Sequence, residues 1–176
     1  MKQLIFLMVI STAGGLGAIY QPFWGVLLYY FLAVLRPQYL WGWALPFEWR
    51  WSLFAGLIVI GGVLLNARQT LFAARTNPIM WLAGLYGILY GISCLTAHNP
   101  ALSQPWVIDA AKILIMVVIA SLVIKHLWQV WLMVAATVGA LGYIAWNINS
   151  LYFFQGGRLD VFHHGFGGFD NNGAGL

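Results

Sequence analysis

The stretch "VIDAAKILIMVVIASLVI", residues 107–124, decides the fold of this chain: it is an apolar run with one acid, Asp109, and one base, Lys112. A helix of this length measures about 27 Å, close to the ~30 Å hydrocarbon core of a membrane. In lipid a backbone must satisfy its own hydrogen bonds, and a helix does so within one segment. The stretch therefore predicts a transmembrane helix.

Short breaks that carry charge or proline separate this run from five similar ones. The six hydrophobic segments are 3–19, 22–35, 51–66, 79–96, 107–124 and 127–147. They predict an all-α fold, a polytopic transmembrane helix bundle with five to six crossings. The join "YQP" at 20–22 is tight, so the first two segments form either a short hairpin or one long broken span.

The composition excludes a water-soluble globule. Hydrophobic residues make up 62% of the chain and charged residues only 7%, which is too little polar surface to cover a soluble protein. The net charge of +4 rests on eight basic and four acidic residues, so we interpret it as an orientation signal and expect no nucleic-acid partner.

Two regions are expected along the chain. Residues 1–147 form the transmembrane helical bundle, and residues 148–176 form a polar, glycine-rich loop that leads into an incomplete next helix. The distribution of basic residues does not choose an orientation. With six crossings Lys2 shares a face with Arg36, and with the first two segments as one crossing it shares a face with Lys125.

Two patterns suggest how the segments meet each other and the membrane surface. The stretch "RPQYLWGWALPFEWRW", residues 36–51, holds four tryptophans and suits the headgroup level. We favour an anchoring belt there over a lateral helix or loop that touches a lipid headgroup. Small residues at helical spacing, Gly87 with Gly91 and Ala135 with Gly139, predict close helix packing.

Lys112 is the main candidate for chemistry within a span. Asp109 lies three residues earlier on the same helical face, so the two can neutralise each other near the start of the helix. Isolating such a charge in the membrane costs about 2.5–3.5 kcal/mol on insertion scales. An ion pair with a snorkelling lysine and a site for an anionic substrate group are equally consistent with the sequence.

The histidines do not predict a metal site. His98 and His126 fall in a short polar loop and a tight turn, where we expect surface positions. His163 and His164 are adjacent, so they point apart on any regular backbone, and no further ligand stands at a recognisable spacing. No cofactor motif is present either, because the glycines that follow lack the strand and lysine of a nucleotide loop.

Several stretches in sequence order resemble a known family. They are "QPFWGVLLYYFLAVLRPQYLWGWALP" at 21–46, "LTAHNP" at 95–100, "AAKILIM" at 110–116 and "GGFDNNGAGL" at 167–176. Together they resemble the N-terminal half of the bacterial O-antigen ligase and polymerase superfamily, with the strongest likeness to O-glycosylation ligases associated with exosortase systems.

The resemblance implies a multi-pass enzyme of the bacterial inner (cytoplasmic) membrane. Such an enzyme moves glycan from an undecaprenyl-diphosphate carrier to an acceptor on the periplasmic side, without a metal or other cofactor. Residues 97–106 and 148–176 would then be periplasmic. The resemblance assigns Lys112, Arg158 and Arg36 to carrier phosphates, and His163 and His164 to the side facing the donor. It assigns Asp170, Asn171 and Asn172 to ordering the loop or capping a helix.

The departure from the family is as informative as the match. The family continues through more helices and a large periplasmic loop that holds its principal catalytic arginine and histidine, which residues 1–176 do not include. We expect one of two situations. The chain is either the N-terminal part of a longer ligase, or a truncated, non-catalytic relative that serves as an accessory subunit beside partner proteins, lipids or pigments in a membrane complex.

Overall fold

The structure, a computed structural model, describes residues 2–41, 45, 51–66, 77–97 and 100–155, and this part of the chain is helical with no strand. The helices are α1 (Lys2–Tyr20), α2 (Pro22–Leu35), α3 (Pro37–Leu40), α4 (Trp51–Leu65), α6 (Pro78–Leu95), α7 (Pro100–Val123) and α8 (Leu127–Gln155). The predicted all-α class is confirmed for these residues. Three helices are long and apolar enough to cross a membrane, namely Lys2–Tyr20, Pro78–Leu95 and Leu127–Ser150, which suits a membrane protein.

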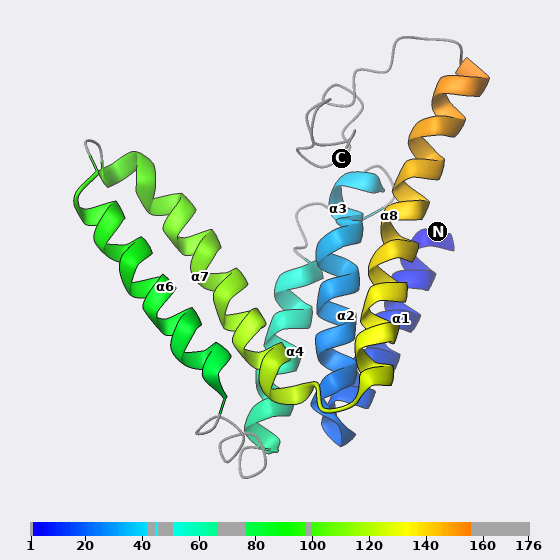
Figure 1. Ribbon diagram of the computed structural model, residues 1–176. Coiled ribbons are helices and arrows are strands. Elements are labelled where there is room, and N and C mark those ends of the chain that lie inside the picture. Colours follow the sequence, from blue (N-terminus) through cyan, green and yellow to red (C-terminus); the bar gives the residue numbers. More distant parts are fainter. Residues whose placement is uncertain (1, 42–44, 46–50, 67–76, 98–99, 156–176) are drawn as a thin grey trace.

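The first two segments form an antiparallel hairpin, not one broken span. A methyl group added at Gly14 would touch Leu28, and one added at Gly17 would touch Trp24. A later residue of α1 thus contacts an earlier residue of α2, which shows that the two helices are antiparallel. The tight join is closed by the backbone N–H of Gln21, which donates to the Gly17 carbonyl oxygen at 2.9 Å. The start of α1 and the end of α2 therefore lie at the same end of the molecule (Figure 1).

Helix α2 is the centre of the bundle and packs against α1, α4, α7 and α8 (Figure 1). Two clusters of buried side chains share it. One joins it to α1, α3, α4 and α8 and includes Leu7, Leu28, Leu32, Leu35 and Ala140. The other joins it to α4 and α7 and includes Phe23, Val26, Val59, Met116 and Ala120. Because both clusters depend on α2, this helix determines where α7 is held.

Small residues allow α1, α2 and α4 to approach closely. A Cβ at Gly62 would lie 2.7 Å from the carbonyl oxygen of Ala18, and a Cβ at Gly25 would lie 2.9 Å from the Ala18 Cβ. The predicted packing positions are different, and two of them are wrong. Among the described residues, no atom lies within 4 Å of a Cβ added at Gly91 or Gly139. Helical spacing shows that small residues share a face, but not whether another helix meets that face.

Helices α6 and α7 form a second pair, which diverges from the bundle toward the loop that joins them (Figure 1). Asn77 ties the other end of the pair together. Its Oδ1 accepts from the Ile79 N–H at 2.9 Å and caps α6, while its Nδ2 donates to the Ser121 carbonyl oxygen at 3.1 Å. No residue of α6 is buried. The pair is therefore held to the bundle through α7.

Two predicted boundaries are corrected. α7 begins at Pro100, so residues 100–106 are helical and the predicted polar loop at 97–106 is much shorter. Proline suits the first helical position because its φ angle is already helical and no partner is lost. α8 continues to Gln155, eight residues past the predicted end at 147. Asn147 lies at the predicted end and Asn149 within the extension, and each side chain donates to the carbonyl oxygen four residues earlier, so the helix leaves neither amide without a partner.

The two described members of the predicted tryptophan belt are buried within the bundle. Trp41 is 7% exposed and Trp51 is 4% exposed, and both belong to the buried cluster around α2. The Trp41 ring packs edge-on against Phe6 at 6.2 Å and Tyr143 at 5.8 Å between ring centroids. The Trp41 ring therefore helps to hold α1 and α8 against the end of α2, and the anchoring role of the stretch stays a prediction. The other two tryptophans of the stretch lie outside the described residues.

Adjacent glycines in α4 give a matched test of the close approach. We expect Gly62→Ala to lower the free energy of unfolding by about 1–3 kcal/mol, because the added methyl group meets backbone and α1 has to move away from α4. Gly61→Ala meets nothing within 4 Å and should be neutral or stabilising by up to about 1 kcal/mol. Unfolding midpoints in a neutral detergent measure both. Equal effects of the two variants would contradict the proposed contact.

Candidate functional site

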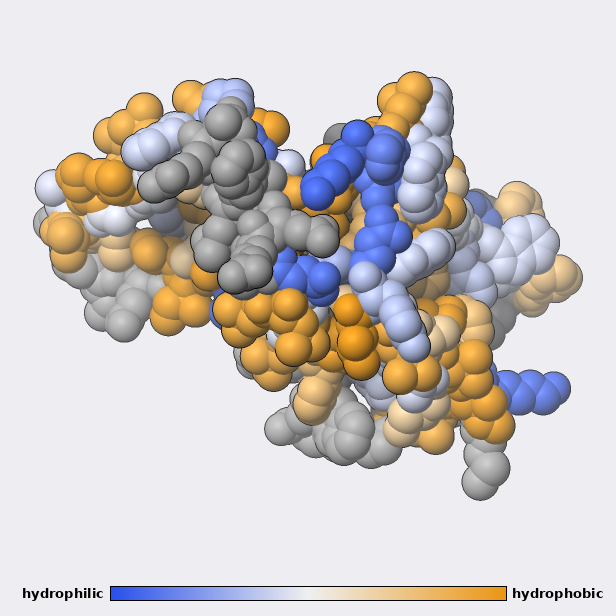
Figure 2. Space-filling model, turned by 90° about the horizontal axis from the view of Figure 1, so that it is seen from below, coloured by the Kyte–Doolittle hydropathy of each residue, from blue (hydrophilic) through white to orange (hydrophobic). Residues whose placement is uncertain are grey.

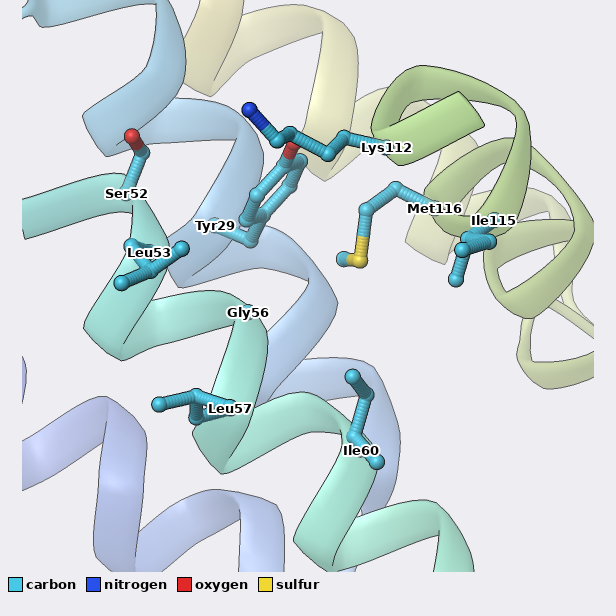
Figure 3. A pocket seen from close by; sticks show the side chains of 9 residues that line it. All are labelled: Tyr29, Ser52, Leu53, Gly56, Leu57, Ile60, Lys112, Ile115 and Met116. Carbon is cyan, nitrogen blue, oxygen red and sulfur yellow. The ribbon is translucent and has the colours of Figure 1, made fainter. Parts of the chain in front are cut away.

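A pocket of about 310 Å³ lies between α4 and α7, with α2 behind it (Figure 3). Cavities of this size hold small ligands or part of a larger one. Its walls come from three helices that are far apart in sequence. The lining residues are Tyr29 from α2, Ser52, Leu53, Gly56, Leu57 and Ile60 from α4, and Lys112, Ile115 and Met116 from α7.

Lys112 occupies the middle of its helix. It is the thirteenth of the 24 residues of α7, about 18 Å from the helix start at ~1.5 Å per residue. The sequence placed it near the start of a shorter helix, where a lysine can reach the headgroups with little cost. The apolar part of α7 is Ala110–Val123, however, so Lys112 lies close to the polar end of that part, and its position suits a snorkelling lysine as well as a binding role.

The lining of the pocket is amphipathic. Lys112 extends from α7 toward the side where Tyr29 and Ser52 lie, and Met116 points into the space between the helices (Figure 3). One ammonium and two hydroxyl groups can donate hydrogen bonds to an anion. Leu53, Leu57, Ile60, Ile115 and Met116 supply the apolar remainder of the wall. This arrangement suits a ligand that joins an anionic group to a hydrocarbon chain.

Gly56 keeps the pocket open on the α4 side. A Cβ at this position would lie 3.6 Å from the ring of Tyr29, so the glycine leaves the face of α4 flat where the tyrosine ring approaches it. A larger side chain would occupy space that now belongs to the pocket.

The structure separates the two described cations that the sequence assigned to a phosphate. Arg36 is exposed, with left-handed backbone angles (φ 45°, ψ 59°), between α2 and α3, and it does not line the Lys112 pocket. Its backbone N–H donates to the Leu32 carbonyl oxygen at 3.0 Å and ends α2. Arg158, His163, His164, Asp170, Asn171 and Asn172 lie outside the described residues, as does the side chain of Asp109.

Other polar residues that the sequence singled out fall at the surface. Lys125 and His126 are exposed in the turn between α7 and α8, as expected for His126. Among the described residues no three histidine, cysteine, aspartate or glutamate side chains are grouped closely enough to hold a metal ion.

Sequence reasoning missed Tyr29 and Ser52 as partners of Lys112 in the pocket. Each stands alone as a polar group at the edge or middle of an apolar run, and their spacing in sequence carries no sign that they meet. Only the packing of α2 between α4 and α7 brings them together.

Met116 tests how α7 is held beside the pocket. Met116 is 4% exposed and belongs to the buried cluster, whereas its neighbour Ile115 is 52% exposed. We expect Met116→Ala to lower the free energy of unfolding by about 2 kcal/mol or more, because it leaves a cavity between α7 and α2. Ile115→Ala should cost less than about 1 kcal/mol. Detergent unfolding titrations compare the two, and similar losses would show that α7 is not docked in this way.

Comparison of the chain with protein-family models, with curated proteins and with solved structures gives no match. None of the three assigns the chain to a family. Its function is therefore inferred from the residues that line the pocket and from the resemblance in the sequence.

Proposed function

We propose that this chain is the N-terminal part of an O-antigen-ligase-like membrane glycosyltransferase. Such an enzyme transfers glycan from an undecaprenyl-diphosphate carrier to an acceptor. In this proposal the pocket between α4 and α7 holds the phosphate end of the carrier lipid, with Lys112 as its cationic ligand. The observation that carries the proposal is a lysine of α7 that lines an otherwise largely apolar pocket.

The chemistry of the pocket supports an amphiphilic, anionic ligand. A hydrogen bond between an ammonium group and a phosphate oxygen is charge-assisted and roughly twice as strong as a neutral one. Surrounding apolar side chains lower the local dielectric constant, which strengthens that interaction further. Lys112 would offset negative charge on the diphosphate as the glycan departs, while the hydroxyl groups of Tyr29 and Ser52 orient the phosphate.

The proposal includes six crossings, formed by α1, α2, α4, α6, α7 and α8. At ~1.5 Å per residue α2 and α4 are only about 21–23 Å long, which is short for a ~30 Å hydrocarbon core. The longer helices α1, α7 and α8 pack around α2, whereas α4 packs against α1 and α2 and leaves Leu64 and Leu65 exposed at its end. On this topology the end of α8 and the α6–α7 loop face the periplasm, and the hairpin brings Lys2 and Arg36 to that side as well.

Removing the charge of Lys112 tests the proposal. In a neutral detergent we expect the chain to bind undecaprenyl diphosphate more tightly than undecaprenol, which has the same hydrocarbon chain without phosphate. Lys112→Gln should weaken binding of the diphosphate about tenfold or more, because it removes a charge-assisted hydrogen bond, and should leave undecaprenol binding unchanged. Native mass spectrometry measures both affinities.

Two matched variants complete the test. Lys2→Gln removes a positive charge outside the pocket and should leave the preference for the diphosphate intact. Gly56→Leu fills the pocket and should weaken the binding of both undecaprenyl diphosphate and undecaprenol, because it removes volume and leaves the charge unchanged. If Lys112→Gln binds the diphosphate as tightly as the original chain, the proposal fails.

A second proposal is supported by α6. None of its residues is buried, although the helix is 18 residues long, and it carries a stacked pair of rings, Tyr86 and Tyr90, with centroids 6.0 Å apart. Trp81 on the same helix is 72% exposed. An unburied aromatic helix of this kind suits an accessory, non-catalytic subunit whose outer surface packs against a partner in a larger membrane complex.

Co-purification distinguishes the two proposals. An accessory subunit should be extracted from the native membrane together with a partner protein in a fixed stoichiometry. The double substitution Trp81→Ala with Tyr86→Ala should reduce the amount of partner that co-purifies. The same double substitution should leave the Lys112 pocket and its lipid preference unchanged. Recovery of the native protein alone, with activity in glycan transfer, would exclude the accessory role.

A further inference from the structure

A second pocket, of about 360 Å³, lies between α1 and α8, with α2 behind it. It lies toward the end of the bundle where α1 begins and α2 ends (Figure 1). Its lining residues are Lys2, Gln3 and Phe6 from α1, Phe31 and Leu35 from α2, Trp41, and Gly139, Ala140 and Tyr143 from α8. It shares no lining residue with the Lys112 pocket, so its role does not rest on the function proposed there.

Two small residues of α8 leave room for this pocket. Ala140 is buried and packs in the cluster around α2, whereas a Cβ added at Gly139 meets no atom of the described residues within 4 Å. A larger side chain at position 139 would occupy the space between α1 and α8. Buried Leu35 and Ala140 both line the pocket, so it is a recess in the packed bundle and not part of a flat outer face.

Four of the nine described residues that line the pocket are aromatic, namely Phe6, Phe31, Trp41 and Tyr143. The Trp41 ring meets Phe6 at 86° and Tyr143 at 69° between ring planes. Rings that meet at steep angles turn their faces in different directions, and such a cage attracts an ammonium group. Trp41 is buried and held by both neighbours, so the cage exists before a ligand arrives. Phe6 is 43% exposed and Tyr143 is 41% exposed, so a ligand can reach these rings.

The polar groups of the pocket suit a ligand that carries both charges. The Lys2 ammonium, the Gln3 amide and the Tyr143 hydroxyl can all donate hydrogen bonds, and none of the described residues that line the pocket is acidic. A ligand with a positive charge alone would therefore meet Lys2 without a balancing carboxylate. A ligand with an ammonium group and a phosphate avoids this repulsion, because its phosphate pairs with Lys2 while its ammonium lies against the rings.

We propose that this pocket binds the headgroup of a zwitterionic phospholipid. The ammonium group lies within the aromatic cage, and the phosphate accepts from Lys2 and Gln3. The start of α1 and the end of α2 are at the level of lipid headgroups if these helices cross a membrane. Viewed from the opposite end, hydrophilic residues gather near the middle of the molecule with apolar residues around them, so lipid suits the sides of the bundle (Figure 2). Exposed apolar residues beside the lining residues in sequence would contact the acyl chains, namely Ile5 and Val138.

Lipids that differ only in the headgroup test the proposal. In a neutral detergent we expect phosphatidylethanolamine and phosphatidylcholine to bind about fivefold or more tightly than phosphatidylglycerol with the same acyl chains, because only the first two carry a cation. Native mass spectrometry measures these affinities, and the unfolding midpoint should rise in the same order. Equal affinities for the three lipids would show that the ammonium group is not recognised, and would overturn the proposal.

Two glycines of α8 give a matched pair of variants. Gly139→Leu fills the pocket and Gly142→Leu adds the same side chain outside it, and at both positions an added Cβ meets no atom of the described residues within 4 Å. Without lipid, both variants should unfold at the original midpoint or higher, because leucine favours a helix more than glycine does. Only Gly139→Leu should lose the preference for zwitterionic lipids. A preference that survives in Gly139→Leu would place the binding elsewhere and overturn the proposal.

Ring and charge variants test the two halves of the site separately. Phe6→Leu keeps the wall apolar but removes one ring, so it should reduce the preference for phosphatidylethanolamine over phosphatidylglycerol severalfold. Phe154→Leu removes an exposed ring that does not line the pocket and should leave this preference unchanged. Lys2→Gln should weaken phosphatidylethanolamine binding severalfold, whereas Lys125→Gln removes a positive charge at the opposite end of the bundle and should not. Equal effects within either pair of variants would contradict the proposed site.

Discussion

The close approach of α1, α2 and α4 at Ala18 is the contact on which the rest of the structure depends. Gly25 and Gly62 converge on this alanine from two helices, and at Gly62 the backbone of α1 leaves no room for a methyl group. In lipid the hydrophobic effect does not draw helices together, so dispersion contacts between closely placed backbones have to do so. Without this contact α2 would lose its fixed place at the centre of the bundle.

The position of α2 determines the position of the candidate site. Phe23, Val26 and Val59 form the surface on which Met116 and Ala120 of α7 pack, and this contact holds α7 beside α4. One turn earlier along α7, the Lys112 side chain extends over Tyr29 toward Ser52 (Figure 3). The pocket is therefore a product of helix packing. Its lysine comes from the outer helix pair, and its hydroxyl groups come from the inner bundle.

The two ends of the bundle place their cations in different settings. At one end Arg36 lies on an exposed turn whose left-handed backbone ends α2. At the other, Lys125 and His126 flank the buried amide of Gln129, whose oxygen already has two donors and whose nitrogen has no acceptor in the described part of the chain. Charge alone does not distinguish these ends, since basic residues occur at both. Their difference lies in the neutral groups around the charges.

The lengths and order of the apolar runs are enough to predict the helices and the suitability of the chain for a membrane. An α-helix satisfies its backbone within one segment, so a long apolar run is enough to indicate it. Four of the six predicted segments match the described helices within one residue at each end, and the other two differ at one end each, the start of α7 and the end of α8. Those two boundaries were wrong because Pro100 can begin a helix as well as interrupt an apolar run, and because asparagine can satisfy its side-chain amide inside a helix.

Only the tertiary structure decided which residues meet. Gly62 contacts α1 while Gly91 faces open space, although both stand in similar apolar surroundings. Trp41 turns back onto Phe6 and Tyr143, and Tyr29 meets Lys112 across more than 80 positions of sequence. These contacts depend on how helices cross, which local periodicity does not encode. Gln129 is likewise buried by the packing around α8, which its polar side chain in an apolar run does not predict.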